Sequence, residues 1–517
     1  MKRNLYFSAS LLSLAAAGGA LSACQQQPGT PAKPNVILIL ADDVGYGDLS
    51  PYGFARVETP NVQRLAQCGI RFTNAHAVAA TSTPSRYSLF TGMYSWRRDD
   101  TGIAAGDAGM VIRPEQYTVA DLFRDNGYAT GAIGKWHLGL SRETGGQDWN
   151  GHVTPGPEDI GFSYSYIMAA TGDRVPCVWM ENQRVVNLDP TDPIFVSYKT
   201  PFEGEPLGKD HPELLTKLHP SPNHGHDQAI VNGISRIGYM KGGKSALWED
   251  EDIADTIATK AVSFIDTHKS EPFFLYVGTN DIHVPRWPNE RFAGKSGMGP
   301  RGDAILAFDW TVGRILDALE QHNLLDNTIV ILTSDNGPVV DDGYADQAVA
   351  LLGNHLPWGN LRGGKYSNFE AGTRVPMIIH WPKGMEGSQA KGSVSPALVS
   401  HIDLVGTMAS MLQASVPQTQ ATDSKNALPT WRGKDDKGRE YVVESAGSLS
   451  LFDGTYKYIL PSQGGKLNRL TNIELGNDKE DQLYNMISDI GETQNLASQE
   501  PERVTRMRGL LEAEKAK

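Results

Sequence analysis

Charged and titratable side chains follow four apolar runs of this sequence, each within a few residues of the end of the run. The runs span residues 36–40, 129–133, 273–277 and 329–332. Short continuous apolar runs are typical of strands that are buried on both faces. Because ligands of open α/β sheets bind beyond the carboxyl ends of the strands, we expect the side chains after these runs to meet at one sheet edge. They are Asp42, Asp43, Lys135, His137, His283, Asp335 and Asn336.

These side chains combine oxygen ligands, cations and proton carriers. The oxygen ligands suit Ca²⁺, and less well Mg²⁺, rather than zinc; they are Asp42, Asp43, Asp335 and Asn336. Cations are supplied by Arg86, Lys135 and Lys365. A metal ion together with cations is what an oxyanion such as sulfate or phosphate needs, both to bind and to be transferred. The histidines can carry protons near neutral pH.

The segment 81–92, TSTPSRYSLFTG, contains a serine with no visible means of activation. No Gly-x-Ser-x-Gly turn surrounds Ser82, and no histidine lies within a few residues of it. A serine hydroxyl is a poor nucleophile without a neighbouring base. A cluster of Ser, Thr and Pro is also typical of a helix N-cap. On its own, the segment is therefore compatible with an ordinary helix that starts near Ser85.

The elements that must position these residues alternate along the chain. Besides the four apolar runs, residues 375–380 predict a strand, and helical spacing predicts helices over 119–125, 253–267 and 304–319. Strands that alternate with helices indicate an α/β fold. The Gly-, Pro- and polar-rich residues 173–247 predict a long elaboration outside the core, and Cys68 and Cys177 are interpreted as small core residues.

Composition is that of an ordinary globular protein, with 517 residues, 40% hydrophobic and 21% charged. This length predicts two or more domains. The formal net charge is −13, which argues against a nucleic-acid-binding surface. Since the overall field repels anions, an anionic substrate requires a local basic pocket.

The first residues predict a targeting segment. Lys2 and Arg3 precede a short apolar run, which is followed by Leu-Ser-Ala-Cys at residues 21–24 and a polar Gln/Pro/Gly stretch. This arrangement resembles the lipobox of bacterial lipoproteins. We therefore predict a signal peptide over 1–23, lipidation of Cys24 and a tether over 24–33, which would anchor the protein to the cell envelope, in the periplasm or at the outer membrane. The alternative is an ordinary signal peptide with a chance cysteine.

The motifs together resemble the formylglycine-dependent sulfatase family, in its serine-type bacterial branch. Residues 82–92, STPSRYSLFTG, are similar to the family signature Cys/Ser-x-Pro-Ser-Arg-x-x-x-x-Thr-Gly. The resemblance extends over nearly the whole chain beyond the leader and keeps the family's order. It is carried by PNVILILADDVGYGDLSPYG, GYATGAIGKWHLG, PFFLYVGTNDIHVP, NTIVILTSDNGP, LRGGKYSNFEAGTRVPMIIHWP and DQLYNMISDIGETQNLA.

The resemblance explains the unactivated serine. It implies that an anaerobic radical-type maturating enzyme oxidises Ser82 to formylglycine (3-oxoalanine), which rests as a geminal diol and forms a covalent sulfate intermediate. It also implies one Ca²⁺ held by Asp42, Asp43, Asp335, Asn336 and the Ser82-derived group. Arg86 and Lys135 would hold the diol. Contacts to the sulfate and the leaving oxygen would come from His283 and Lys365, and His137 would take the proton that releases sulfate.

The implied fold is that of the alkaline-phosphatase superfamily. It has a large mixed sheet flanked by helices, here over residues 34–415. A smaller C-terminal α+β subdomain over 421–517 would add a short antiparallel sheet and a closing helix.

For the substrate, the resemblance and the lipoprotein signal suggest an exo-acting sulfatase on host or algal glycans of the galactose or N-acetylgalactosamine type. Candidate sugar contacts are Asp341, Asp342, His355, His224 and His226. One alternative is a phosphatase or phosphodiesterase of the same superfamily, although such enzymes typically use two zinc ions and several histidine ligands. The other is a non-catalytic glycan-binding lipoprotein, although every expected site position holds a competent residue type.

Overall fold

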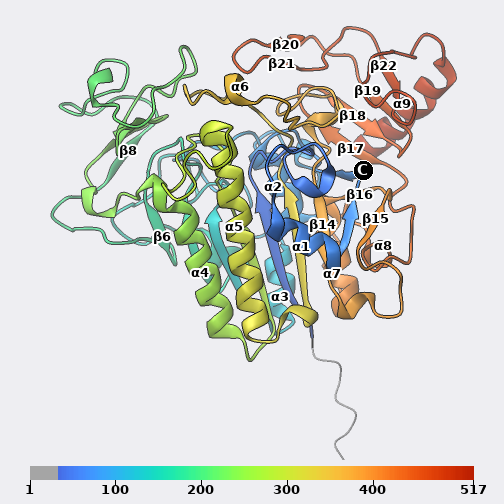
Figure 1. The fold of residues 1–517 in the computed structure, drawn as a ribbon, viewed down its shortest axis with the longest axis horizontal. Coiled ribbons are helices and arrows are strands. Elements are labelled where there is room, and N and C mark those ends of the chain that lie inside the picture. The colour runs from blue at the N-terminus through green and yellow to red at the C-terminus, as the bar shows by residue number, and fades with distance from the viewer. Residues whose placement is uncertain (1–32) are drawn as a thin grey trace, which may run out of the picture. The chain divides into compact units, whose positions relative to one another are not determined.

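A computed structural model describes residues 33–517, which are built around a ten-stranded sheet (Figure 1). Its strand order is β15 (Ser393–Ser395), β2 (Ile70–Phe72), β14 (Met377–His380), β13 (Thr328–Ser334), β1 (Asn35–Ala41), β12 (Phe273–Gly278), β4 (Ala129–Lys135), β5 (Tyr164–Met168), β6 (Trp179–Glu181) and β7 (Arg184–Val185). The centre of the sheet is parallel, and β14, β6 and β7 run antiparallel to their neighbours. The predicted large mixed sheet is confirmed.

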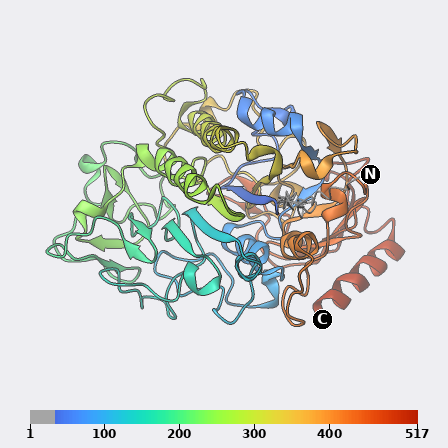
Figure 2. The same ribbon diagram turned by 90° about the horizontal axis from the view of Figure 1, so that it is seen from below.

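The central strands are predominantly apolar because helices cover both faces of the sheet. All seven residues of β1 are buried. One face carries α1 (Pro60–Cys68), α4 (Ile253–His268) and α5 (Gly299–Gln321). The other carries α2 (Ser82–Thr91), α3 (Val119–Asp125) and α7 (Leu404–Leu412), as Figure 2 shows from below. This is the layered arrangement expected of an α/β domain.

Local signals fix the helix ends. The side chain of Thr118 accepts from the backbone N–H of Asp121, and the Asp121 carboxylate accepts from the Thr118 N–H, so a capping box starts α3 at the predicted residue. Helix α5 starts five residues before the predicted position, at Gly299, because Pro300 is well suited to a first helical turn.

The C-terminal part adds a four-stranded antiparallel sheet of β17 (Val442–Ser445), β18 (Leu449–Phe452), β19 (Tyr456–Ile459) and β22 (Gln482–Asn485). Helix α9 (Pro501–Lys515) packs against β18 and β19. The expected small sheet and closing helix are therefore present. Residues 34–517 form one compact unit, so the domain boundary between 415 and 421 stays a prediction.

The long elaboration contributes more to the core than its composition indicated. Strands β6 and β7 extend the main sheet, and Cys177 is fully buried beside them. Two antiparallel strand pairs follow, β8 (Phe195–Ser197) with β11 (Tyr239–Lys241), and the hairpin β9 (Ile230–Val231) with β10 (Ile234–Ser235). The other cysteine, Cys68, ends α1 and is only partly buried.

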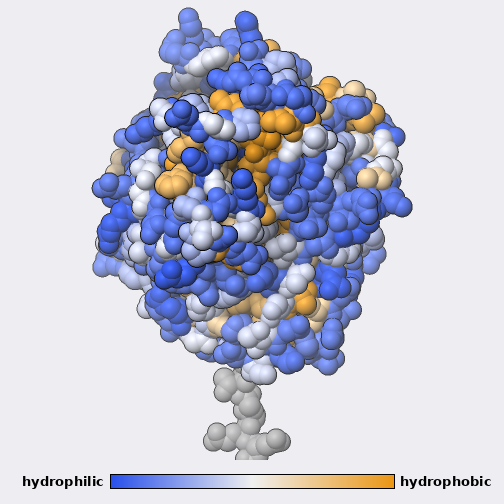
Figure 3. Space-filling view, turned by 90° about the vertical axis from the view of Figure 1, so that its left-hand side faces the viewer, coloured by the Kyte–Doolittle hydropathy of each residue, from blue (hydrophilic) through white to orange (hydrophobic). Residues whose placement is uncertain are grey.

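The remaining elements are short. They are the pair β3 (Ala75–His76) and β16 (Val399–Ser400), the hairpin β20 (Leu467–Asn468) and β21 (Ile473–Glu474), and the helices α6 (Ala348–Leu351) and α8 (Leu428–Trp431). Seen from the left-hand side of Figure 1, the surface is mostly hydrophilic, with hydrophobic side chains gathered in a hollow in its upper half (Figure 3). Among the described residues, none of the helices has both the length and the apolar character of a membrane span. The predicted leader, Cys24 and most of the tether lie outside the described residues.

Candidate active site

Ser82 is the first residue of helix α2, so the helix starts three residues earlier than the sequence indicated. The Ser82 Oγ donates to Asp335 Oδ2 at 2.5 Å and accepts from Arg86 Nε at 3.0 Å. The four-residue spacing puts Ser82 and Arg86 on the same helix face. The Ser82 side chain is only 3% exposed. A residue at this position faces the site with the positive end of a helix dipole behind it.

The four predicted oxygen ligands meet because β1 and β13 are neighbouring parallel strands that end at the same edge. The Asp43 N–H donates to Asp335 Oδ1 at 3.2 Å, and Asn336 Nδ2 donates to Asp43 Oδ1 at 2.8 Å. All four side chains, including Asp42, are buried. Asp43 has a φ of 58°, a strained conformation for a residue other than glycine that is common at functional sites.

This ligand set fits a hard divalent cation. Asp42 Oδ1 and Asn336 Oδ1 are buried and have no hydrogen-bond partner, although such atoms normally have one. Burial raises the pKa of Asp42 despite the nearby Lys135, so an ionised Asp42 gains from further positive charge. The donor atoms of Asp42, Asp43 and His283 also lie within 4.8 Å of one another. An ion bound by the oxygen ligands would therefore have His283 as a neighbour.

Two of the predicted cations, Arg86 and Lys135, contact these carboxylates and are fully buried. Arg86 Nη2 donates to Asp335 Oδ2 at 3.0 Å, and its Nη1 donates to the Tyr276 hydroxyl. Lys135 Nζ donates to Asp42 Oδ2 at 2.6 Å. Burial lowers the pKa of Lys135, and the carboxylate of Asp42 opposes that effect. Both cations are held by more than one element of the fold and are thus preorganised around Ser82.

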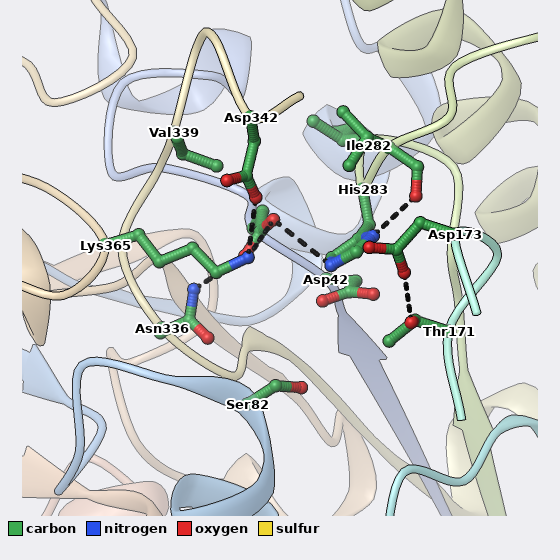
Figure 4. Close-up of polar contacts among 12 residues, drawn as sticks. Asp42, Ser82, Thr171, Asp173, Ile282, His283, Asn336, Val339, Asp342 and Lys365 are labelled. Carbon is green, nitrogen blue, oxygen red and sulfur yellow. Dashed lines mark hydrogen bonds and ion pairs between the residues drawn. The ribbon is translucent and has the colours of Figure 1, made fainter. Parts of the chain in front are cut away.

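Lys365 and His283 approach the centre of the site from opposite sides, with Ser82 below them (Figure 4). Lys365 Nζ donates to Asp43 Oδ2 at 2.8 Å and to Asp342 Oδ2 at 3.1 Å. Burial opposes the charge of Lys365, yet Asp342 and Asp43 hold its pKa well above the usual value. Lys365 is therefore protonated at neutral pH, and it forms part of the pocket wall.

The two histidines present different ring nitrogens to the site. His137 Nε2 lies 3.0 Å from the Ala104 carbonyl and must donate to it, which leaves Nδ1 as an unpartnered acceptor. Burial, with Lys135 adding to it, lowers the pKa of His137 well below its usual value, so the ring is a neutral base. His283 instead donates from Nδ1 to the Val284 carbonyl at 2.7 Å. Its Nε2 lies 3.9 Å from Asp43 Oδ2 and faces the site.

A pocket of about 210 Å³ opens above Ser82, and several of the predicted residues line it. Its lining includes His137, His283 and Lys365, and three of the five candidate sugar contacts, Asp342, His224 and His226.

The other two candidate sugar contacts lie elsewhere. His355 is fully buried away from the pocket; its Nδ1 accepts from the Arg56 N–H at 2.9 Å and its Nε2 lies 2.7 Å from Asp48 Oδ1. Both ring nitrogens are used, so the predicted sugar contact by His355 is wrong. Asp341 lines a neighbouring cavity with Leu352 and Trp358 rather than the pocket above Ser82.

Three further lining residues were not predicted from the sequence: Asp173, Arg174 and Tyr366. Asp173 Oδ1 accepts from Arg174 Nη1 at 3.1 Å, and its Oδ2 lies 3.0 Å from His226 Nε2. Asp173 and Arg174 start the polar elaboration, where no periodic pattern singles out a side chain. Tyr366 follows Lys365 and has a φ of 75°, which a sequence does not reveal.

Comparison with known proteins agrees with this geometry. Residues 34–414 match the Sulfatase protein-family model. The chain is 52% identical over 487 residues to an N-acetylgalactosamine-6-O-sulfatase of Bacteroides thetaiotaomicron, covering 94% of both chains. It is 30% identical to human steryl-sulfatase over 430 residues, or 78% of this chain and 71% of that protein.

Solved structures give the same result. A Bacteroides thetaiotaomicron sulfatase, described with a core genetic locus for metabolism of multiple glycosaminoglycans, has a TM-score of 0.91 and 52% identity, covering 94% of this chain and all of that one. Ps i-CgsB in complex with k-i-k-neocarrahexaose has a TM-score of 0.66 and 25% identity, covering 93% of both chains. The family is one that typically uses a metal ion and formylglycine, and this chain belongs to the sulfatase family as a hydrolase of sulfate esters.

Proposed function

We propose that this sulfatase removes 6-O-sulfate groups from N-acetylgalactosamine or galactose residues at the ends of sulfated glycan chains, with glycosaminoglycans as the substrate class. The similar protein of Bacteroides thetaiotaomicron bears the name N-acetylgalactosamine-6-O-sulfatase and aligns with 94% of this chain. The observation that carries the proposal is the position of Ser82, at a helix start between buried carboxylates and cations in the floor of a pocket.

The charges around Ser82 support a sulfate ester as the substrate. The carboxylates of Asp42, Asp43, Asp335 and Asp342 outnumber the cations Arg86, Lys135 and Lys365 by one negative charge. A divalent cation at the oxygen ligands would turn this into one positive charge. That charge complements a sulfate monoester, which carries a single negative charge, and it stabilises charge that develops during transfer.

We propose that the ion is Ca²⁺ and that the nucleophile is formylglycine made from Ser82. Addition of water to the formylglycine aldehyde gives a geminal diol, and one of its hydroxyl groups would attack sulfur, a reactivity that serine lacks without a base. Arg86 and Lys135 orient this group, and the neutral Nδ1 of His137 accepts a proton. Lys365 and His283 lie on the pocket side, where either can donate a proton to the leaving oxygen.

The sugar would lie against the polar side chains of the pocket wall. The carboxylate of Asp173, held by Arg174 and His226, is suited to accept a hydrogen bond from a sugar hydroxyl, and Arg174 is suited to donate one. The cavity volume of about 210 Å³ favours one ring over a long chain segment. This supports action on the end of a chain.

Two parts of the proposal lie outside the described residues or outside the chain. We propose that Cys24 is lipidated and holds the enzyme at the bacterial cell envelope, which the lipobox-like residues 21–24 support. We also propose that an anaerobic radical-type maturating enzyme converts Ser82, since the signature at 82–92 carries serine in place of cysteine.

Sulfate release from position-defined sugars tests the substrate assignment. The enzyme, produced with a radical maturase, should act on 6-sulfo-N-acetylgalactosamine and 6-sulfo-galactose at least ten times faster than on the 4-sulfated isomers. The Ser82→Ala variant serves as the inactive control. A preference for the 4-sulfated sugars, or for the C4 epimer 6-sulfo-N-acetylglucosamine, would contradict the proposal.

A further inference from the structure

A second cavity adjoins the pocket above Ser82. It has a volume of about 510 Å³, against about 210 Å³ for the pocket itself. The two cavities share four lining residues, Thr81, Ile103, Tyr366 and Asn468. These shared residues place the two cavities side by side, so a ligand that leaves the pocket above Ser82 on this side would reach the second cavity. A glycan held by its terminal ring would have room for a second ring here.

Exposed residues of two separate segments line the second cavity. One wall includes Gly102 and Ile103, and Ile103 is 48% exposed. The other wall includes Ala446 and Gly447, which are also exposed. An exposed, continuous groove of this kind can admit a chain that enters from solvent. The sulfate pocket, by contrast, ends on buried residues such as Ser82.

The lining of the second cavity suits a hydroxylated ring. It combines the aromatic residues Trp96 and Tyr366 with small polar side chains such as Thr101, Asn468 and Asn477. Aromatic side chains with a few hydrogen-bonding groups are typical of small-molecule sites, in which the polar groups fix the orientation of the ligand.

Among the residues that the structure describes, Arg98 is the one cationic residue in the lining of the second cavity, and it is paired. The Arg98 guanidinium donates to both oxygens of Asp100 at 2.8 and 2.6 Å and to Gln116 Oε1 at 2.8 Å. The exposed Asp99 adds a negative charge to the same lining. A second sulfate group or a carboxylate would therefore gain no free positive partner in this cavity.

We propose that this cavity is the subsite for the second sugar ring of the glycan, bound through its hydroxyl groups rather than through a charged group. The inference rests on the proposed function, because it takes the sulfated ring to occupy the pocket above Ser82. It adds that the enzyme binds two rings, and that the second ring helps to stabilise the transition state through contacts with uncharged groups.

The test compares two substrates, a sulfated monosaccharide that the enzyme hydrolyses and the disaccharide in which the same sulfated ring is the non-reducing end. We expect kcat/KM for the disaccharide to be at least tenfold higher. Blocking the groove with Gly102→Trp or Ala446→Trp should reduce this ratio at least tenfold. An added Cβ at Gly102 meets no atom within 4 Å, and Ala446 is exposed, so neither change should disturb folding.

Matched controls lie on helix α9. Gly509 also has no atom within 4 Å of an added Cβ, and Ala513 is exposed. Gly509→Trp and Ala513→Trp should keep the wild-type ratio. A further sulfate on the second ring of the disaccharide should not raise kcat/KM, and an increase would overturn the neutral character of the subsite.

The outcomes separate this inference from the proposed function. Equal kcat/KM for the two substrates, or an unchanged ratio in both blocked variants, overturns the second-ring subsite while leaving the sulfatase assignment intact. A preference for another sulfate position changes the proposed function, but the same comparison with that sugar still decides the subsite. A structure of the Ser82→Ala variant with any sulfated disaccharide that the enzyme hydrolyses gives a direct answer, since a second ring outside this cavity refutes the inference.

Discussion

His401 lies in the core behind the Ser82 helix, and its burial should make the folded protein sensitive to acid. The residue begins a short helix that packs against α2 and is 3% exposed. Its Nε2 lies 2.8 Å from Thr333 Oγ1, and its Nδ1 has no partner. Burial lowers the pKa of His401 to about 4, although the nearby carboxylate of Asp335 opposes the effect. The ring is therefore neutral in the folded protein at neutral pH.

The sign and size of the effect follow from this pKa. In the unfolded chain the pKa of a histidine is about 6.5. Below that pH the unfolded state binds more protons than the folded state, so the free energy of unfolding falls as the pH decreases from about 6.5 to about 4. The stability from a neutral His401 is fully present above pH 6.5. Between pH 7 and pH 5, linkage gives a loss of about 2 kcal/mol from this residue.

The substitution His401→Gln removes the titrating group and keeps a polar side chain. Urea unfolding of the wild type and the variant at pH 7, 6 and 5 measures the effect. We expect the variant to lose about 2 kcal/mol less than the wild type over this range, even if it is less stable at pH 7. His152→Gln is the control for replacing a histidine at a more exposed position, because the side chain of His152 is 38% exposed. Equal losses in His401→Gln and the wild type would refute the reasoning.

Three further predictions concern the site itself. After production with a radical maturase, mass spectrometry should show that the peptide that contains Ser82 is lighter by two hydrogens. Ser82→Ala should abolish sulfate release and lower the free energy of unfolding by about 1 kcal/mol. Full activity with unmodified Ser82 would contradict this. Chelation should remove both activity and calorimetric binding of a sulfated sugar, and Ca²⁺ should restore them better than Zn²⁺. His137→Asn should reduce kcat about 10²–10⁴-fold, and, because the pKa of His137 is well below its usual value, kcat/KM of the wild type should show no acid limb attributable to this residue near pH 6.5.

Site residues that directly follow strands of the sheet could be predicted from the sequence. Asp42 and Asp335 follow neighbouring parallel strands, and the carboxyl ends of such strands meet by geometry alone. An apolar run and the polar residues directly after it are enough to place these side chains. The start of α2 was less predictable, because Ser82 and Ser85 are both acceptable at a helix N-terminus and only the fold decides between them.

The parts that could not be predicted depend on long loops. His355 has the chemistry of a ligand, but the direction of a loop side chain is set by its partners, here Asp48 and the backbone of Arg56. Asp173 gave no signal because the residues around it lack strand or helix periodicity. Its contact with His226 forms only when Arg174 pairs with Ile237, which brings the segment around His226 to the Asp173 carboxylate. Substrate-facing loops are positioned by tertiary contacts, which a single sequence does not encode locally.

The electrostatics of the site connect the ion, the substrate and the net charge of the protein. A chain of formal charge −13 repels anions at long range, so binding of a sulfated glycan depends on charges inside the pocket. Those charges are buried, where they interact strongly because solvent screens them little. With the carboxylates in excess by one, the protein side chains alone disfavour a sulfate ester, and a divalent cation reverses the sign. We therefore expect the proposed ion to be needed for the substrate to enter the pocket as well as for turnover. This is why loss of sugar binding on chelation, measured in the inactive Ser82→Ala variant, separates a role of the ion in binding from a role in chemistry alone.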